Sequence, residues 1–217
     1  MKATLPLLAL AGLLSLSAGI WYLWLPKLER VQRVLELQPD AARGKDAVIW
    51  NYLPDQSYPY HPQLLASAWT FQEQPTIMRS LFSFDLSALG RDARIEKASL
   101  QLHHHVANRN PGHNGLNQAL ISRIIEPWEE QDVTWNTQPA TTPLHQVSLP
   151  LSEHGEQDYT VDVTALMQDA LQHSDQSFGF MLQLSNETHY RSMVFASSDA
   201  ADAGLRPALT ITYTTRQ

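Results

Sequence analysis

Three consecutive histidines, His103, His104 and His105, are the most conspicuous candidates for metal chemistry in this sequence. In an extended strand, residues i and i+2 project from the same face, so His103 and His105 offer two imidazoles side by side. His113 follows in the next loop. Because spacing alone identifies no carboxylate to complete a tetrahedral zinc shell, solvated or hydrogen-bonded histidines at a strand end are the alternative.

Aromatic side chains gather in and beside a Pro-rich stretch, Leu53 to Gln63, and include Trp50, Tyr52, Tyr60 and Trp69. Exposed aromatic rings stack on the C–H faces of sugars, and loops tend to carry binding residues. Packing of the loop against the core is the alternative reading. Trp128 and Trp135 are interpreted as packing anchors.

Arg79 and Arg191 could converge on one concave face and bind a sugar carboxylate bidentately. We favour a structural role instead. Arg79 and Asp85 share one strand face, and Asp162 could lie on a strand beside Arg191, so both guanidinium groups have candidate partners within the fold.

Signatures of catalysis are absent from the sequence. Glu129 and Glu130 are adjacent, so they project to opposite sides of an extended chain and cannot flank one bond. The sequence has no Gly-x-Ser-x-Gly elbow, no His-Glu-x-x-His helix and no phosphate-binding glycine loop. We therefore expect a protein that is not an enzyme.

The amino-acid composition excludes further classes of function. The 217 residues contain no cysteine and carry a formal charge of −7. Disulfides and thiolate chemistry are thus excluded, and binding to nucleic acid is disfavoured because the net charge repels phosphate.

An uncharged, Leu-rich run extends from Leu5 to Leu25 and is about long enough to cross a bilayer as a helix. We predict that residues 1–25 form an N-terminal hydrophobic helix, either a cleaved signal peptide or a signal anchor. Residues 26–43 are expected to be a linker or a short helical stalk, since Leu28, Val31 and Leu35 fall at helical spacing. The protein is then secreted or held in the cell envelope, with the membrane reached only through this segment.

Residues 44–217 show an all-β pattern of short apolar stretches separated by Pro, Asn, Gly and Asp. In the clearest strand, Ala98 to Val106, apolar and polar residues alternate. One internal helix is expected, capped by Thr164, with Leu166 and Ala170 inward and Asp169 outward. Such a series of short strands predicts an antiparallel β-sandwich of jelly-roll type.

Several short motifs occur in a specific order and together resemble the DNRLRE domain, also grouped as carbohydrate-binding module family 96 and related to disaggregatase-type proteins. The resemblance covers roughly residues 44–213. The motifs are Asp46-Ala47, Arg79 to Ser87, Ala98 to Leu102, Trp128 to Pro139, Asp162 to Leu166, Phe195 to Asp199 and Arg206 to Leu209.

The resemblance implies an extracellular β-sandwich that binds polysaccharide, and in some relatives acidic glycans are held by basic residues near the first strands. Here that region offers only Lys45 and Arg79. By analogy with other sandwich-type sugar binders, Asp46, Asp55 and Asp199 are candidate ligands of a structural calcium ion.

The sequence therefore predicts an exported, non-catalytic module that binds a polysaccharide or a cell-envelope glycan at the cell surface. Two other readings stay open. One is a structural or adhesive protein that acts through protein contacts, and the other is a polysaccharide lyase or hydrolase. An exposed aromatic row would favour the glycan-binding module, and a flat apolar patch would favour the protein that acts through protein contacts. A deep acidic cleft would favour the lyase or hydrolase.

Overall fold

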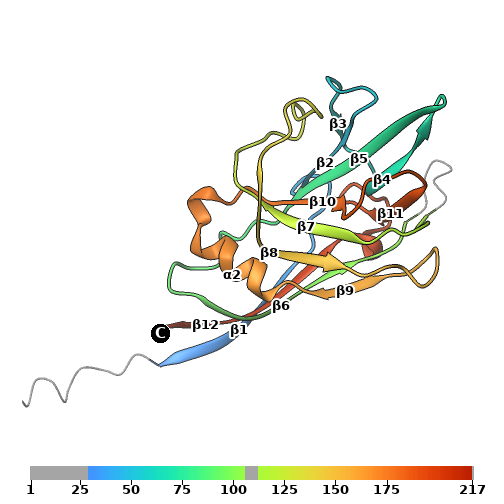
Figure 1. Ribbon diagram of the computed structural model, residues 1–217. Coiled ribbons are helices and arrows are strands. Elements are labelled where there is room, and N and C mark those ends of the chain that lie inside the picture. Colours follow the sequence, from blue (N-terminus) through green and yellow to red (C-terminus); the bar gives the residue numbers. More distant parts are fainter. Residues whose placement is uncertain (1–28, 106–111, 217) are drawn as a thin grey trace, which may run out of the picture.

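The computed structural model describes residues 29–105 and 112–216, so the predicted hydrophobic helix at residues 1–25 lies outside the described residues. Within them, antiparallel strands dominate (Figure 1). The strands are β1 (Arg30–Leu37), β2 (Lys45–Trp50), β3 (Tyr58–Pro59), β4 (Gln63–Phe71), β5 (Gln74–Ser83), β6 (Arg94–Leu102), β7 (Ala119–Ile124), β8 (Thr141–Leu149), β9 (Tyr159–Asp162), β10 (Phe180–Leu184), β11 (Arg191–Ala196) and β12 (Ala208–Arg216).

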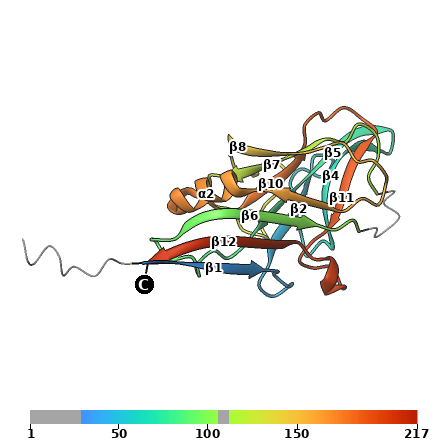
Figure 2. The same ribbon diagram turned by 90° about the horizontal axis from the view of Figure 1, so that it is seen from below.

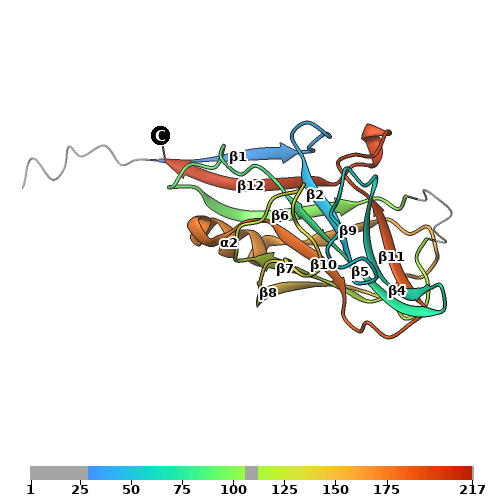
Figure 3. The ribbon, with the colours of Figure 1, turned by 90° about the horizontal axis from the view of Figure 1, so that it is seen from above.

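The strands form two sheets that pack face to face (Figures 2 and 3). The four-stranded sheet has the order β1-β12-β6-β9, and the eight-stranded sheet has the path β11-β4-β5-β10-β7-β8. In the larger sheet β2 also pairs with β5, and β3 pairs with β2. The predicted all-β antiparallel sandwich is confirmed. Its finer assignment to the jelly-roll type stays a prediction.

The core lies between the sheets and follows from the alternation in the strands. In β6, Leu100 and Leu102 are buried, as predicted, and Ile211 of β12 lies in the same core cluster. From the other sheet, Ile121 and Leu182 pack into that cluster. Because the side-chain period of a strand is two, each of these strands gives one apolar face to the core.

The prediction of a helical stalk within residues 26–43 is wrong, because β1 is a strand. Its residues pair one to one with β12, from Arg30↔Arg216 to Leu37↔Leu209. Leu35 and Leu37 pack against the core. The strand forms because β12 would otherwise present an unpaired edge, and the folded domain therefore begins before residue 44.

The predicted internal helix is confirmed as α2 (Thr164–Gln172), although two of its details were wrong. Thr164 does not cap it, because its Oγ1 accepts a hydrogen bond from the Ala98 N–H at 2.9 Å. Asp169 is buried rather than outward and accepts a hydrogen bond from Arg123 Nε at 2.6 Å. Among the described residues, no helix is long and apolar enough to cross a membrane.

Candidate functional site

Aromatic side chains from three strands and two loops share one sheet face around the β4–β5 hairpin. The register places Trp69 opposite Thr76, Phe71 opposite Gln74, and Trp50 of β2 opposite Met78. Residues that are directly paired, or two apart on one strand, project to the same side, so Trp50, Trp69 and Phe71 share a face.

The rings make two groups of contacts on this face, one around Trp50 and one around Trp69. The centroid of Phe71 lies 5.0 Å from that of Trp50 and 4.8 Å from that of Tyr52. The Trp69 ring lies 5.3 Å from Tyr190, edge to face. Such T-shaped pairs are a favourable aromatic geometry. We call this set the aromatic row; its members are Trp50, Tyr52, Tyr58, Trp69, Phe71 and Tyr190.

The aromatic row is partly open to solvent. Phe71 is 42% and Tyr190 59% exposed, whereas Thr76 beneath the rings is buried. Trp50, Tyr52 and Trp69 keep intermediate exposure. The row thus offers a surface of ring faces and edges on which the C–H face of a sugar could stack.

A strained hairpin turn holds one end of the row. Gln72 and Glu73 both have positive φ, 47° and 65°, although neither is glycine. A non-glycine residue in this conformation costs about 1 kcal/mol or more. The turn places Gln72 Oε1 where it accepts a hydrogen bond from the Tyr52 hydroxyl at 2.7 Å, which orients that ring.

The sequence located part of this site. Of the candidates named from the sequence, Trp50 and Tyr52 contact each other and Trp69 lies on the same face. Tyr60 is not part of the aromatic row: its hydroxyl accepts a hydrogen bond from Gln131 Nε2 at 2.7 Å. Phe71 and Tyr190 were missed. Phe71 could have been found, because it lies two residues after Trp69 and must share its face.

The Arg79 side chain is bonded to other side chains of the protein and is not free to bind a ligand. Its Nε and Nη2 donate to the two carboxylate oxygens of Glu187 at 2.8 and 2.9 Å, and its Nη1 donates to Gln138 Oε1 at 2.8 Å. The guanidinium also lies over the Trp135 ring. The favoured structural role is thus supported, but the partner is Glu187 and not Asp85.

Arg191 does not pair with Asp162, because the two residues lie in different sheets. Arg191 Nη1 donates to the backbone oxygen of Asn186 at 3.3 Å, and Asp162 Oδ1 accepts from the Thr164 N–H. The register of neighbouring strands could not be derived from sequence, which is why the predicted pair was wrong.

Trp128 anchors a second, smaller core on the outer side of the larger sheet. Its Nε1 donates to the Phe178 backbone oxygen at 2.8 Å, and its ring packs in a buried cluster with Ile49, Leu81 and Val133. The interpretation of Trp128 as a packing anchor is confirmed. Trp135 packs against the same cluster.

The predicted histidine metal site is not assembled. His113 is buried: its Nδ1 accepts from the Val194 N–H at 3.1 Å, so its Nε2 carries the proton and donates to the Gln157 oxygen at 2.8 Å. Both nitrogens are therefore occupied. His103 Nδ1 lies 3.0 Å from Asp158 Oδ2, while Gln63 Nε2 donates to the backbone oxygen of His105.

His113 predicts acid sensitivity. Burial lowers the pKa of His113 from 6.5 to about 4, although its bond to Gln157 opposes this shift. Below about pH 6.5 the unfolded chain binds a proton on this residue that the folded chain does not, so the contribution of His113 to stability falls by up to about 3 kcal/mol as the pH approaches about 4. The raised pKa of Asp46 acts in the opposite direction over this range. Urea unfolding across this range should show that the free energy of unfolding of the wild type falls relative to that of His113→Gln as the pH is lowered. An equal slope in both would contradict the assignment. His61 and His104 also have lowered pKa values, so some pH dependence should persist in the variant.

A different set of metal-type ligands meets instead. Within the described residues, the one group of three such side chains with ligand atoms within 4.8 Å of one another is Asp46, Glu130 and Asp199. The Asp46 carboxylate is buried and accepts hydrogen bonds from the Ser198 N–H and hydroxyl. Burial raises the pKa of Asp46 to about 7. Two of the three predicted calcium ligands are thus close together, whereas Asp55 accepts a bond from Asn136 elsewhere.

Calcium binding at this cluster is a prediction that melting experiments can test. Carboxylate oxygens are the ligands that Ca²⁺ prefers, and a cation would relieve repulsion among three adjacent acids. We expect millimolar CaCl₂ at about pH 8 to raise Tm by several degrees, and EDTA to reverse the change. The Asp46→Asn variant should not respond. An unchanged wild-type Tm would rule out a stabilising site.

A family model described as carbohydrate-binding module family 96 matches residues 40–213, which is most of the described chain. No curated protein matches the sequence.

Proposed function

Because the chain belongs to carbohydrate-binding module family 96, we propose that it binds a polysaccharide or a cell-envelope glycan and does not cleave it. The aromatic row is the observation that carries this proposal. Its rings lie edge to face at a half-exposed surface, which suits stacking on sugar C–H faces. Since few rings contribute, affinity at this site should be weak.

The proposal also includes the cellular location of the protein. The uncharged run from Leu5 to Leu25 supports export, so the domain would act outside the cytoplasm, secreted or in the cell envelope. The net charge of −7 argues against nucleic acid as the partner.

Two matched tyrosines test the aromatic row. Tyr190 and Tyr60 are 59% and 55% exposed, and both have positive φ, 67° and 58°, but only Tyr190 belongs to the row. We expect Tyr190→Ala, and likewise Phe71→Ala, to weaken glycan binding about tenfold, and Tyr60→Ala to leave it unchanged. The measurement is affinity electrophoresis of the full chain through gels that contain galactomannan, mixed-linkage β-glucan or polygalacturonate.

Three other results would contradict the proposed site or the proposed function. Equal loss in Tyr190→Ala and Tyr60→Ala would mean that the row is not the site. If the wild type is retained by none of these polysaccharides and by no isolated envelope glycan, a role in protein contacts would replace glycan binding. Release of reducing or unsaturated ends from a retained polysaccharide would show an enzyme.

A further inference from the structure

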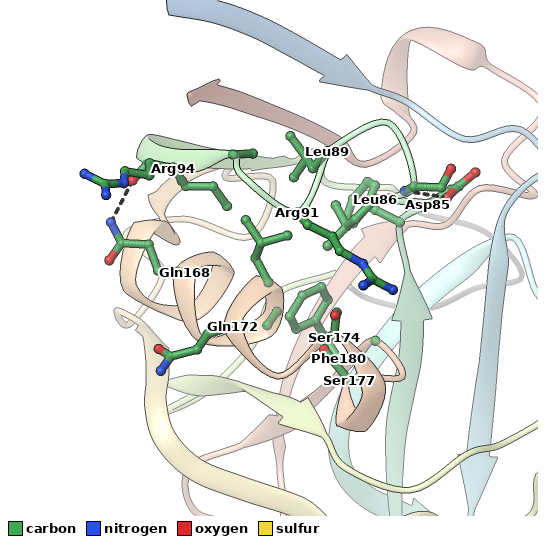
Figure 4. Close-up of a pocket in the computed structure, with 17 residues that line it drawn as sticks. Asp85, Leu86, Leu89, Arg91, Arg94, Gln168, Gln172, Ser174, Ser177 and Phe180 are labelled. Carbon is green, nitrogen blue, oxygen red and sulfur yellow. Dashed lines mark hydrogen bonds between the residues drawn. The ribbon is translucent and has the colours of Figure 1, made fainter. Parts of the chain in front are cut away.

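A groove with a volume of about 1050 Å³ lies between α2 and the loop of residues 84–93 (Figure 4). Phe180, Leu89 and Ala170 contribute its apolar floor, and all three are largely buried. The rim is polar and includes Arg91 and Ser174. No pattern along the chain indicates this groove, because its two walls are more than seventy residues apart in sequence.

The groove and the aromatic row lie at opposite ends of the molecule. In all three ribbon views, α2 lies at one end of the sandwich and the β4–β5 hairpin points to the other (Figures 1, 2 and 3). A ligand in the groove would therefore not extend the site at the hairpin. The groove and the aromatic row are therefore separate surfaces.

Polar groups at the groove are free to bind a ligand. In the part of the chain that the structure describes, the side chains of Arg91, Ser174 and Ser177 take part in no hydrogen bond or salt bridge within the protein. Figure 4 shows the Arg91 guanidinium over the groove, above Phe180, whereas the guanidinium of Arg94 points away. Donors without a protein partner beside an apolar floor can supply the few polar contacts that a ligand site uses.

Both walls of the groove are held in place. The buried Arg123–Asp169 pair joins α2 to β7. The opposite loop is tied through Asp92, whose carboxylate accepts bonds from the Arg216 N–H at 2.8 Å and the Thr215 hydroxyl at 3.0 Å. The groove is thus formed before any ligand arrives, which reduces the entropy lost on binding.

The chemistry of the groove fits a hydroxyl-rich ligand better than an acyl chain. A guanidinium and serine hydroxyls can bond to sugar hydroxyls, and the exposed apolar area is limited because the floor residues are largely buried. We propose that the groove is a second carbohydrate-binding site, so that one chain bridges two glycan strands from its opposite ends. This inference rests on the proposed function.

The stoichiometry of binding tests the second site. Isothermal titration of the full chain should use hexasaccharides cut from a polysaccharide that retains the protein in the affinity gel. We expect two hexasaccharides per chain in the wild type and in the control Arg94→Ala. Arg91→Ala should weaken one site about tenfold, and Phe71→Ala the other. Because Arg91 is exposed, Tm should not change.

Bridging gives a second readout. The wild type and Arg94→Ala should make a dilute solution of the same polysaccharide turbid, whereas Arg91→Ala and Phe71→Ala should bind without cross-linking. One hexasaccharide per chain, with no effect of Arg91→Ala, would overturn the second site and leave the proposed function standing. Failure of every polysaccharide to retain the protein would overturn both.

Discussion

Replacing Asp169 with alanine is expected to lower the free energy of unfolding by about 3–5 kcal/mol. Arg123 and Asp169 are only 5% and 4% exposed, and their side chains meet at 2.6 Å. Removing the carboxylate leaves the Arg123 charge buried without a counter-charge, although Nη1 keeps its bond to the Gln176 oxygen. Urea unfolding at neutral pH measures the loss.

Two further variants separate charge from packing. Asp169→Asn keeps an acceptor and most of the volume, so its loss should be smaller. The double variant Arg123→Met, Asp169→Leu removes both charges and should recover much of the stability, because a buried ion pair is close to neutral against well-packed apolar residues. A loss below about 1 kcal/mol in Asp169→Ala would show that the pair does not secure α2.

Deleting β1 is the second change with a large expected effect. A chain that begins at residue 44 should lose about 3 kcal/mol or more relative to one that begins at residue 29, since Val31, Leu35 and Leu37 each lose roughly 1 kcal/mol of partial burial. The truncation also exposes the hydrogen-bonding edge of β12, which invites aggregation. Thermal melting and light scattering measure both effects.

Single substitutions in β1 provide the control. Leu35→Ala and Leu37→Ala remove contacts with the core, whereas Val34→Ala alters a side chain that is 59% exposed. We expect a loss of about 1 kcal/mol for each leucine and almost none for Val34. Equal Tm values for the two truncations would mean that β1 does not contribute to the stability of the domain.

Only some residues of the aromatic row could be predicted from the local sequence pattern. Trp50 and Trp69 were found because aromatic side chains beside a Pro-rich loop are visible along the chain. Tyr190 was not found, because it reaches Trp69 only through the pairing of β11 with β4. Strand pairing joins distant segments, and a register shift of one residue would move a side chain to the other face.

For charged side chains as well, the sequence indicated some roles, but the tertiary structure decided the partners. Arg79 was recognised as a residue with a structural partner, yet that partner came from the loop before β11. Asp169 was expected in solvent because a helical wheel shows which residues share a face but not what covers that face. The cluster of Asp46, Glu130 and Asp199 joins three distant segments.

Period-two alternation was enough to establish the class of fold, since a strand such as β6 has no other way to bury Ala98, Leu100 and Leu102 on one side. Ordered motifs likewise indicated the family. The assignment of β1 to a sheet, the partners of the charged side chains and the existence of the groove depended on contacts between residues far apart in the chain. Those contacts are set by packing of the whole molecule, because no local preference specifies which distant surfaces exclude water together.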